Sequence, residues 1–450
     1  MAELLSVGLD LGTTSTQLVV SRLGVANRAS SFAVPELAIS GREILYQSPV
    51  YFTPLLEGNR MDAAAIREIV EQEYRAAGIR REDVDTGAVI ITGETSRKEN
   101  AAAVMEAMAD LAGDFVVAAA GPDLESVLAA KGAGAVEYSE KTGRTVLHMD
   151  IGGGTSNLAL IRRGEIGATG CLNVGGRLVK LENGVVTYVS PVLRGIWDGT
   201  VGRTLTREAG ERLAKLLTSA LEMAAGLREP DELLTRLTTR EAQSELPLNP
   251  PGEDITLSFS GGVADCIDRE VDWQTYGDIG PLLGRAIRES RLCRGKYVLG
   301  SQTIRATVIG AGCHSTQLSG STVFCQNVEF PLKNIPVITG TARRGQDETP
   351  CFHALSGLGE PSYGALTKLA EKIAAEISPP VYLCLEQDMA KALGQALALR
   401  LGKAAPILCL DRVKVSPDSY LDVAAPVGPA FPVVVKTLVL SPNGRNPKET

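Results

Sequence analysis

The sequence lacks the residue clusters that hold zinc or iron–sulfur centres. Its eight cysteines never come closer than twelve positions, so there is no CxxC pair, and its three histidines are equally dispersed. No apolar run approaches the roughly 20 residues that a membrane helix needs. The N-terminus has neither a basic nor an apolar leader segment. We therefore expect a cytoplasmic protein with reduced thiols and no membrane partner.

Aromatic residues and basic charge are also scarce. Phe, Trp and Tyr make up 4% of the chain, too little for a platform on which nucleic-acid bases stack. The formal net charge is -8, which repels a phosphate backbone, so we expect no nucleic-acid partner. The hydrophobic content of 44% is that of a globular protein, and 450 residues predict two or three domains.

The chain has 47 glycines, and a glycine-rich motif occurs in it twice. Residues 7–20 read VGLDLGTTSTQLVV and residues 147–160 read LHMDIGGGTSNLAL. Each copy has an apolar run, an aspartate, a glycine-rich turn with hydroxyl residues and a second apolar run, which predicts a β-hairpin. The aspartates are Asp10 and Asp150. We expect one such hairpin at the start of each of two similar domains.

Apolar periodicity elsewhere predicts an α/β protein. Residues 183 and 184 (Asn-Gly) predict a tight hairpin turn. Residues 308–320 predict a packed helix, so we interpret Cys313 and His314 as packing residues rather than cobalt ligands, and His148 as a core residue of a strand. Helices are expected at 61–78, 96–111, 125–131 and 206–224, strands at 88–93, 115–121, 254–260 and 431–440, and a strand–helix–strand unit at 379–413.

The two hairpins have the composition of a phosphate site. A carboxylate can hold a hydrated Mg²⁺ that bridges two phosphates, while glycine N–H groups and hydroxyls donate to phosphate oxygens. The downstream segment SGGVAD, residues 260–265, offers bare backbone to a base and ribose. We therefore predict ATP and Mg²⁺ in a cleft between the two domains. The metal-binding candidates are Asp10 and Asp150, and the nucleotide-binding candidates are Gly12, Thr13, Thr14, Gly152, Gly153, Gly154, Thr155, Gly261 and Gly262.

These three segments, in this order, resemble the superfamily of actin, the Hsp70-type chaperones and the sugar and acetate kinases. Over essentially the whole chain, GLDLGTTSTQLVVS, VIITGETSRKENA, HMDIGGGTSNLALI, DRVKVSP and PVVVKTLVL are similar to the ethanolamine ammonia-lyase reactivating factors. The resemblance implies an actin-like ATPase (ribonuclease H-like) fold with two similar domains around a nucleotide cleft and a C-terminal α/β extension. We expect the three parts to span residues 1–140, 141–333 and 334–450.

The resemblance also implies a function. A chaperone-like, weak Mg²⁺-dependent ATPase would act on ethanolamine ammonia-lyase, release damaged cobalamin and so let intact adenosylcobalamin bind. The resemblance leaves open whether the protein forms a homo-oligomer and whether the protein associates with a bacterial microcompartment.

Two positions depart from the superfamily pattern. Asn157 stands where many relatives carry an acid, and Gly121 precedes Pro122 where Hsp70-type chaperones have a glutamate. The nearest acids there are Asp123 and Glu125, so the carboxylate that positions the attacking water is unassigned. Glu94 is a further catalytic candidate beside Asp10 and Asp150. A loosely held water implies slow hydrolysis, which suits a switch.

Three alternatives belong to other functional classes. A small-molecule kinase of the same superfamily needs a carboxylate base at its acceptor hydroxyl, and no well-placed candidate emerges. An actin-like filament protein would assemble with ATP. A dehydratase activator would need cysteines that ligate a cluster, which the scattered thiols disfavour.

Overall fold

A computed structural model gives the structure of the chain. It divides into two compact units: Met1–Ile91, Lys98–Ala118 and Gly312–Thr450 form unit 1, and Thr92–Arg97 with Ala119–Ala311 form unit 2. The structure describes residues 2–12, 15–27, 37–56, 60–91, 104, 116–119, 122–239, 246–248, 254–300, 303, 305–314, 316–319, 322–341, 350–356, 362–413, 415, 419–426 and 431–436.

The first sheet of unit 1 starts with the expected hairpin. Strands β1 (Ala2–Leu11) and β2 (Ser15–Asn27) pair antiparallel, and β7 (Thr86–Ile91) runs parallel to β1 on its other side. The sheet order is β3-β2-β1-β7-β8, with β4 also paired to β2. The remaining strands here are β3 (Leu37–Gln47), β4 (Tyr51–Phe52), β8 (Val116–Ala119) and the small pair β5 (Leu55–Leu56) and β6 (Arg60–Met61).

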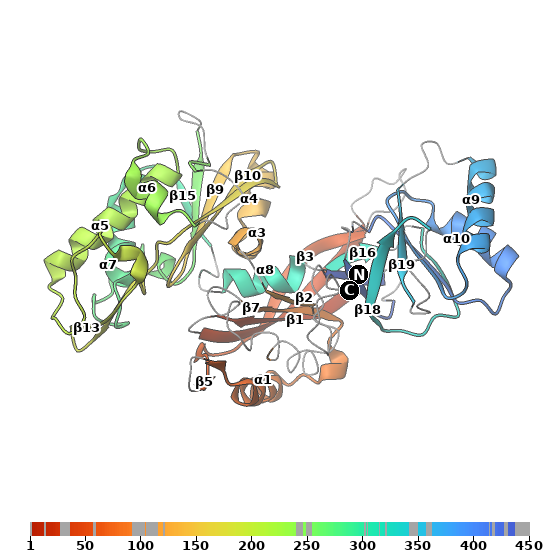
Figure 1. Ribbon diagram of the computed structural model, residues 1–450, viewed down its shortest axis with the longest axis horizontal. Coiled ribbons are helices and arrows are strands. Elements are labelled where there is room, and N and C mark those ends of the chain that lie inside the picture. Colours follow the sequence, from red (N-terminus) through yellow and green to blue (C-terminus); the bar gives the residue numbers. More distant parts are fainter. Residues whose placement is uncertain are drawn as a thin grey trace. The chain divides into compact units, whose positions relative to one another are not determined.

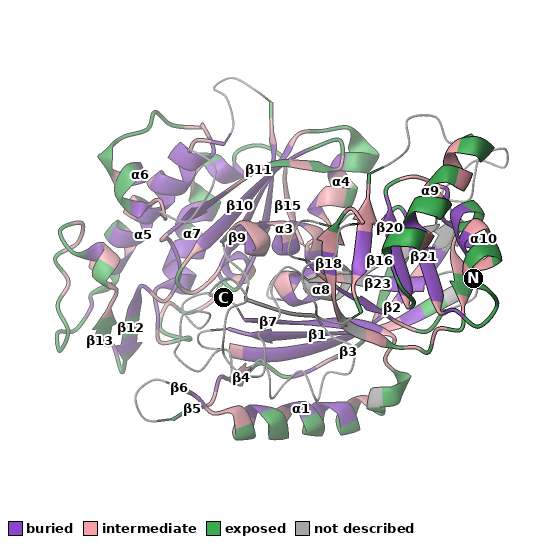
Figure 2. Ribbon diagram, turned by 45° about the vertical axis from the view of Figure 1, so that its right-hand side comes forward, coloured by how far each residue is buried: buried purple, intermediate pink, exposed green. Residues whose placement is uncertain are grey.

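Helix α1 (Ala63–Ala77) packs against this sheet by one face. It begins after Asp62, whose carboxylate accepts from the N–H groups of Ala64 and Ala65, and ends at Gly78 in the left-handed conformation. Its buried residues join those of β1, β2 and β7 in one core, and Figure 2 shows buried and exposed positions alternating along the helix. This is the helix that the periodicity of residues 61–78 predicts. Its buried side chains are Ile66, Val70, Glu73 and Tyr74.

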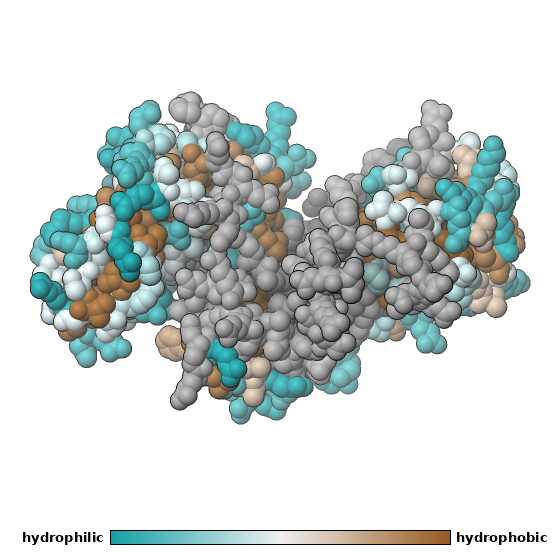
Figure 3. Space-filling view, in the orientation of Figure 1, coloured by the Kyte–Doolittle hydropathy of each residue, from teal (hydrophilic) through white to brown (hydrophobic). Residues whose placement is uncertain are grey.

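The C-terminal part of unit 1 forms an eight-stranded sheet in the order β16-β23-β22-β18-β19-β20-β21-β17. Helices α9 (Tyr363–Glu376) and α10 (Ala390–Leu401) pack beside it, and hydrophilic residues cover much of their outer side (Figure 3). The strand–helix–strand expectation for 379–413 is confirmed by β20, α10 and β21. The strands are β16 (Thr316–Ser319), β17 (Phe324–Gln326), β18 (Leu332–Thr339), β19 (Phe352–Leu355), β20 (Val381–Leu385), β21 (Ile407–Asp411), β22 (Tyr420–Val423) and β23 (Phe431–Lys436).

Unit 2 repeats the topology of the first sheet. Its order is β11-β10-β9-β14-β15, with β9 and β10 as the antiparallel hairpin and β14 parallel to β9. The sequence repeat is therefore a structural repeat, and the expected hairpin of residues 147–160 is confirmed. The strands are β9 (Val146–Ile151), β10 (Ser156–Arg162), β11 (Glu165–Leu172), β14 (Thr256–Ser260) and β15 (Tyr297–Leu299).

Helices cover both faces of this second sheet (Figure 1). Odd-numbered residues of β9, such as Leu147 and Met149, face a large core shared with α5 (Arg207–Ala224) and α7 (Gly280–Glu289). Even-numbered residues face α3 (Pro122–Gly132) and α4 (Ala135–Thr142), where Val146 shares a small core with residues of both helices. The two faces follow from the period of two along a strand. Other elements are α6 (Glu232–Leu237) and the hairpin β12 (Val179–Glu182) and β13 (Val185–Val189).

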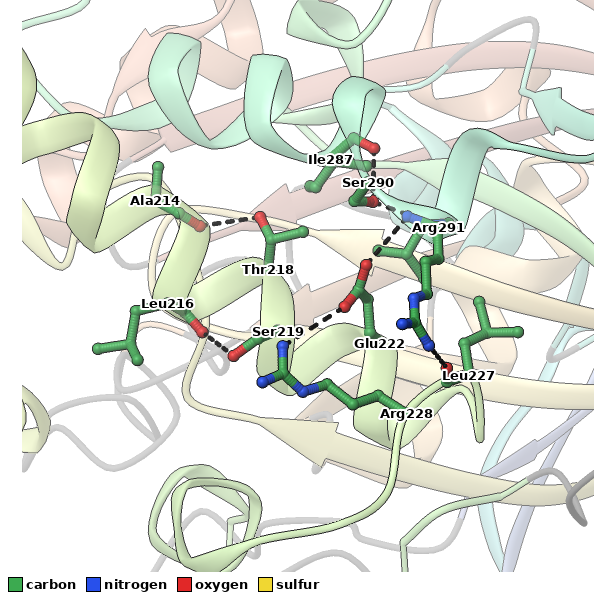
Figure 4. Close-up of polar contacts among 11 residues, drawn as sticks. Ala214, Leu216, Thr218, Ser219, Glu222, Leu227, Arg228, Ile287, Ser290 and Arg291 are labelled. Atoms are coloured by element: carbon green, nitrogen blue, oxygen red, sulfur yellow. Dashed lines mark hydrogen bonds and ion pairs between the residues drawn. The ribbon is translucent and has the colours of Figure 1, made fainter.

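A buried carboxylate fixes the end of α5 (Figure 4). Glu222 accepts from the backbone N–H of Arg291 at 2.9 Å, and the guanidinium of Arg228 lies 3.9 Å from its other oxygen. Arg291 in turn donates to the carbonyl of Leu227 at 2.9 Å. These contacts join the chain after α7 to the C-terminus of α5, so Glu222 has a structural role.

Helices α3 and α8 (Ala306–His314) approach each other closely through glycines. A Cβ on Gly132 would lie 1.7 Å from the carbonyl oxygen of Ala306, and one on Gly310 would lie 1.9 Å from that of Leu128. The helix predicted over residues 308–320 is confirmed as far as His314. The prediction is wrong beyond it, because β16 pairs with β23, a partner that lies far away in the sequence. The helix at 96–111 lies outside the described residues, apart from Val104, which is helical and buried.

Candidate functional site

The first hairpin turn lies in unit 1 and holds Asp10 at the end of β1. Asp10 is 8% exposed, and its register partners are Gln17 on β2 and Ile90 on β7. The N–H of Gly12 donates to the carbonyl of Ser15 at 2.8 Å and closes the turn. The Gly12 carbonyl accepts from the hydroxyl of Thr53 at 2.8 Å, a contact that the sequence did not predict. The predicted Thr13, Thr14 and Glu94 lie outside the described residues.

The second hairpin turn, in unit 2, is closed in the same way. The N–H of Gly152 donates to the carbonyl of Thr155 at 3.0 Å. The next chain segment packs on one side of this turn, because the Gly152 and Gly153 carbonyls accept from the N–H groups of Gly176 and Arg177 at 3.0 and 2.6 Å. A Cβ on Gly154 would meet no atom within 4 Å, so the turn has one packed side and one open side.

The double glycine after β14 packs directly against the second hairpin. Gly261 has φ +89°, and a Cβ there would lie 2.3 Å from the carbonyl oxygen of Ile151. That same oxygen accepts from the N–H of Val263 at 3.1 Å. Gly262, the next residue, is exposed. The structure therefore brings together the second turn, Asp150 and the double glycine, all within unit 2.

Asp150 lies in a row of polar side chains that runs across three strands. Its register partners are Asn157 on β10 and Ser260 on β14, so all three side chains project from the same face of the sheet. The Ser260 hydroxyl donates to the Asp150 carboxylate at 2.5 Å, and Thr307 of α8 donates at 3.4 Å. Burial raises the pKa of Asp150, and these two hydroxyl contacts partly oppose that rise.

His148 lies two residues before Asp150 on β9, so its side chain projects from the same face of the sheet. Its Nε2 lies 2.9 Å from Ser260 Oγ and its Nδ1 lies 3.0 Å from Ser258 Oγ. Burial lowers the pKa of His148 to about 3, so the ring is neutral. Because Ser260 gives its proton to Asp150, Nε2–H must donate to Ser260 and Nδ1 must accept from Ser258. The expected core histidine is confirmed, and it also holds the serine that contacts Asp150.

The two acids at the start of α3 have different partners. Asp123 accepts from the hydroxyl of Thr169 on β11 at 2.5 Å. Glu125, which is 8% exposed, accepts from the Asn157 side-chain amide at 2.9 Å. Glu125 is therefore the acid of this pair that reaches the neighbour of Asp150. The sequence pointed to both acids without separating them, because the partner strand of each was not known.

A basic side chain lies beside the second turn. Carbons of Arg177 would be 3.3 to 3.5 Å from a Cβ on Gly153, and Arg177 Nε lies 3.4 Å from the carboxylate of Asp278. Burial raises the pKa of Asp278, and Arg177 opposes that rise. Sequence reasoning missed Arg177; the signal that could have found it is the double glycine directly before it.

The donors around Asp150 suit a hard cation. Within the described part of the chain, no three His, Cys, Asp or Glu side chains gather into a metal cluster. Mg²⁺ needs no such cluster, because it keeps several waters and takes one or two carboxylates. The side-chain Oδ1 of Asn157 is buried without a hydrogen-bond partner, and so could serve as an additional oxygen ligand of the cation. In the part of the chain that the structure describes, no helix is long and apolar enough to cross a membrane.

The duplicated sheet, with an aspartate and a glycine turn in each copy, defines an actin-like ATPase (ribonuclease H-like) fold. The chain belongs to the EutA family of ethanolamine utilisation proteins, whose model matches residues 2–354 and 343–441.

Curated relatives support this assignment along the whole chain. The ethanolamine ammonia-lyase reactivase EutA of Salmonella typhimurium is 38% identical over 469 residues, covering 97% of this chain and 98% of that protein. The protein of the same name from Escherichia coli K12 is also 38% identical, with the same coverage. Among solved structures, the Aquifex aeolicus member of the Ppx/GppA family is 13% identical, with a TM-score of 0.43 over 68% of this chain and 97% of that one.

Proposed function

We propose that this protein reactivates ethanolamine ammonia-lyase in an ATP-dependent reaction, by releasing damaged cobalamin so that intact adenosylcobalamin can bind. The observation that carries the proposal is the 38% identity to two ethanolamine ammonia-lyase reactivases across 97% of this chain and 98% of each relative. We place this activity in the cytoplasm. A kinase function has no comparable support from the relatives.

The nucleotide would be bound by the two glycine turns. Gly12 with Thr13 and Thr14, and residues 152–155, would donate N–H and hydroxyl groups to phosphate oxygens, and Gly261 and Gly262 would lie against the nucleoside. The open side of Gly154 leaves room for such an approach. Arg177, next to Gly153, would add positive charge at the same turn.

The cation would be held by Asp10 and Asp150. When bound, Mg²⁺ would spread the phosphate charge that develops during hydrolysis. Ser260 and Thr307 orient the Asp150 carboxylate through their hydroxyl groups. Loss of the terminal phosphate would remove contacts to both turns. The lyase would have to bind one nucleotide state more tightly than the other for hydrolysis to drive release of cobalamin.

The test uses ethanolamine ammonia-lyase that has been inactivated by bound cyanocobalamin. Purified protein, adenosylcobalamin, ATP and Mg²⁺ are added, and recovery of ammonia release is followed. We expect recovery with the wild-type chain and loss of recovery with Asp10→Asn or Asp150→Asn. Asp268→Asn is the control, since this aspartate forms an exposed ion pair with Arg288 in unit 2.

Two outcomes would refute the proposal. Recovery without ATP would remove the nucleotide from the mechanism. No recovery by a folded chain that still hydrolyses ATP would remove the lyase, and a screen of hydroxyl acceptors for kinase activity would follow.

A further inference from the structure

Thr53 holds the first glycine turn through a single side-chain hydroxyl. Its Oγ1 donates to the carbonyl oxygen of Gly12 at 2.8 Å and lies 3.1 Å from Oγ1 of Thr16. Because the proton of Thr53 is used on Gly12, Thr16 must be the donor to Thr53. The three groups therefore form a chain of hydrogen bonds that ends on the backbone of the turn.

Strand β4 brings Thr53 to this place. β4 pairs with the start of β2, where Tyr51 lies opposite Thr16. Alternation along the extended chain turns Thr53 inward, where it is 7% exposed, and leaves Phe52 outward, where it is 82% exposed. Tyr51 donates from its hydroxyl to the buried Glu73 of α1, and this contact holds β4 against the helix.

The second turn is held at the corresponding carbonyl, but by the backbone. Gly152 occupies the place of Gly12, because the N–H of each donates across its own turn, to Thr155 and to Ser15 respectively. The carbonyl of Gly152 accepts from the N–H of Gly176 at 3.0 Å. Two segments without sequence similarity thus supply a donor to the same carbonyl. In the first turn alone, that donor is a side chain that a substitution can remove.

A donor on this carbonyl sets the direction of a neighbouring N–H. The peptide bond is planar and trans, so the C=O and the N–H of one peptide unit point in opposite directions. With its carbonyl held by Thr53, the peptide unit that begins at Gly12 offers its N–H to the opposite side. A phosphate oxygen accepts hydrogen bonds and is repelled by a carbonyl oxygen, so only this orientation suits a phosphate.

We infer that Thr53 is a positioning residue for ATP binding: its hydroxyl fixes the Gly12 peptide unit in the orientation that offers an N–H, rather than a carbonyl oxygen, to a phosphate of ATP. The inference rests on the proposed nucleotide function, and it adds to that function a residue outside the glycine motifs. Thr53 lies 41 residues beyond Gly12 in the sequence and acts on the nucleotide only through the turn.

The experiment measures the dissociation constant of a fluorescently labelled ATP analogue for the full-length chain with Mg²⁺, by fluorescence anisotropy. Thr53→Val keeps the shape of the side chain and removes the hydroxyl. We expect its dissociation constant to rise about tenfold, because a hydrogen bond to a charged phosphate is lost. Thr53→Ser keeps the hydroxyl, so its dissociation constant should stay within about twofold of the wild-type value. A role in packing alone predicts the reverse order, because serine leaves a cavity that valine fills.

Thr218→Val is the matched control. Thr218 is 3% exposed, and its hydroxyl donates to the carbonyl of Ala214 at 2.8 Å. The same substitution therefore removes the same kind of contact, inside helix α5 rather than at a glycine turn, and ATP affinity should be unchanged. If Thr53→Val does not fold, Thr53→Ala is compared with Thr53→Ser instead, since these two variants differ only by the hydroxyl.

Wild-type ATP affinity in a folded Thr53→Val, or an equal loss of affinity in Thr53→Ser or Thr218→Val, would overturn the inference. Asp10→Asn tells this failure apart from failure of the proposed function. If Asp10→Asn abolishes ATP-dependent reactivation while Thr53→Val binds ATP normally, only the role of Thr53 is wrong. If the wild-type chain itself binds no ATP, the proposed nucleotide function is wrong.

Discussion

Ser260 Oγ lies 2.5 Å from the carboxylate of Asp150, its register partner on the neighbouring parallel strand, and 2.9 Å from Nε2 of His148. One hydroxyl therefore donates to the carboxylate and accepts from the imidazole. Gly261 and Gly262 have no side chain with which to contact Asp150 or His148. Ser260 therefore orients the carboxylate, a role separate from that of the glycine turn after it.

Ser260→Ala should weaken Mn²⁺ binding in the presence of ADP about tenfold, because partners of a ligating carboxylate commonly contribute that much to metal affinity. Ser258→Ala is the control. Its hydroxyl contacts the other nitrogen of His148 rather than the Asp150 carboxylate, so cation binding should be unaffected. The electron paramagnetic resonance signal of free Mn²⁺ measures the binding. Equal effects of the two variants would show that both serines act only on the packing of His148.

Gly261→Ala should destabilise unit 2. The residue has φ +89°, and its new Cβ would overlap the carbonyl oxygen of Ile151. The left-handed conformation alone costs an alanine about 1–2 kcal/mol. A lowered urea midpoint in intrinsic fluorescence would confirm the prediction. Gly167→Ala, at an exposed position of β11 with open space around it, should leave the midpoint unchanged.

Arg177→Ala should reduce ATP affinity by about ten- to a hundredfold, because a hydrogen bond to a charged group typically contributes about 1.5–3 kcal/mol. Fluorescence anisotropy of a labelled ATP analogue measures this effect. Asp278→Asn keeps the Arg177 guanidinium and removes the negative charge with which it pairs. Affinity that falls equally in both variants would mean that the ion pair, rather than phosphate contact, matters.

Stability should fall at alkaline pH because of Tyr46. Its hydroxyl donates to Glu73 at 2.7 Å, and this hydrogen bond, with burial, raises the pKa of Tyr46 to about 12 from 10.0. Because this pKa is higher in the folded state, the protonated phenol stabilises the fold fully below pH 10. That contribution to the free energy of unfolding is lost as the pH rises towards 12. Between pH 9 and pH 11 the free energy of unfolding, measured with urea, should decline less in Tyr46→Phe than in the wild-type chain. An identical decline would exclude this phenol as the cause.

Most of the fold could be predicted because its signals are local. The Asp-to-glycine hairpins, the Asn183–Gly184 turn with both residues at positive φ, and the amphipathic α1 each follow from patterns within about twenty residues. The end of α8 could not be predicted, since the strand after it is fixed by pairing with β23. The division at residues 140 and 333 stays a prediction.

The candidate site could be predicted only in part. Asp150, its glycine turn and Gly261 are visible as motifs, and the structure brings them together. Ser260 and Glu125 contact Asp150 or its neighbour through strand register and helix packing, which a local pattern does not contain. The roles predicted for Asp10 and for Glu94 stay predictions.

The two sheets share one strand order, but the parallel strand beside each aspartate differs between the two copies. The parallel strand places Ile90 beside Asp10 but Ser260 beside Asp150. One aspartate has an inert neighbour, and the other has a hydroxyl tied to a histidine. The duplicated motif therefore gives its two aspartates different chemical surroundings.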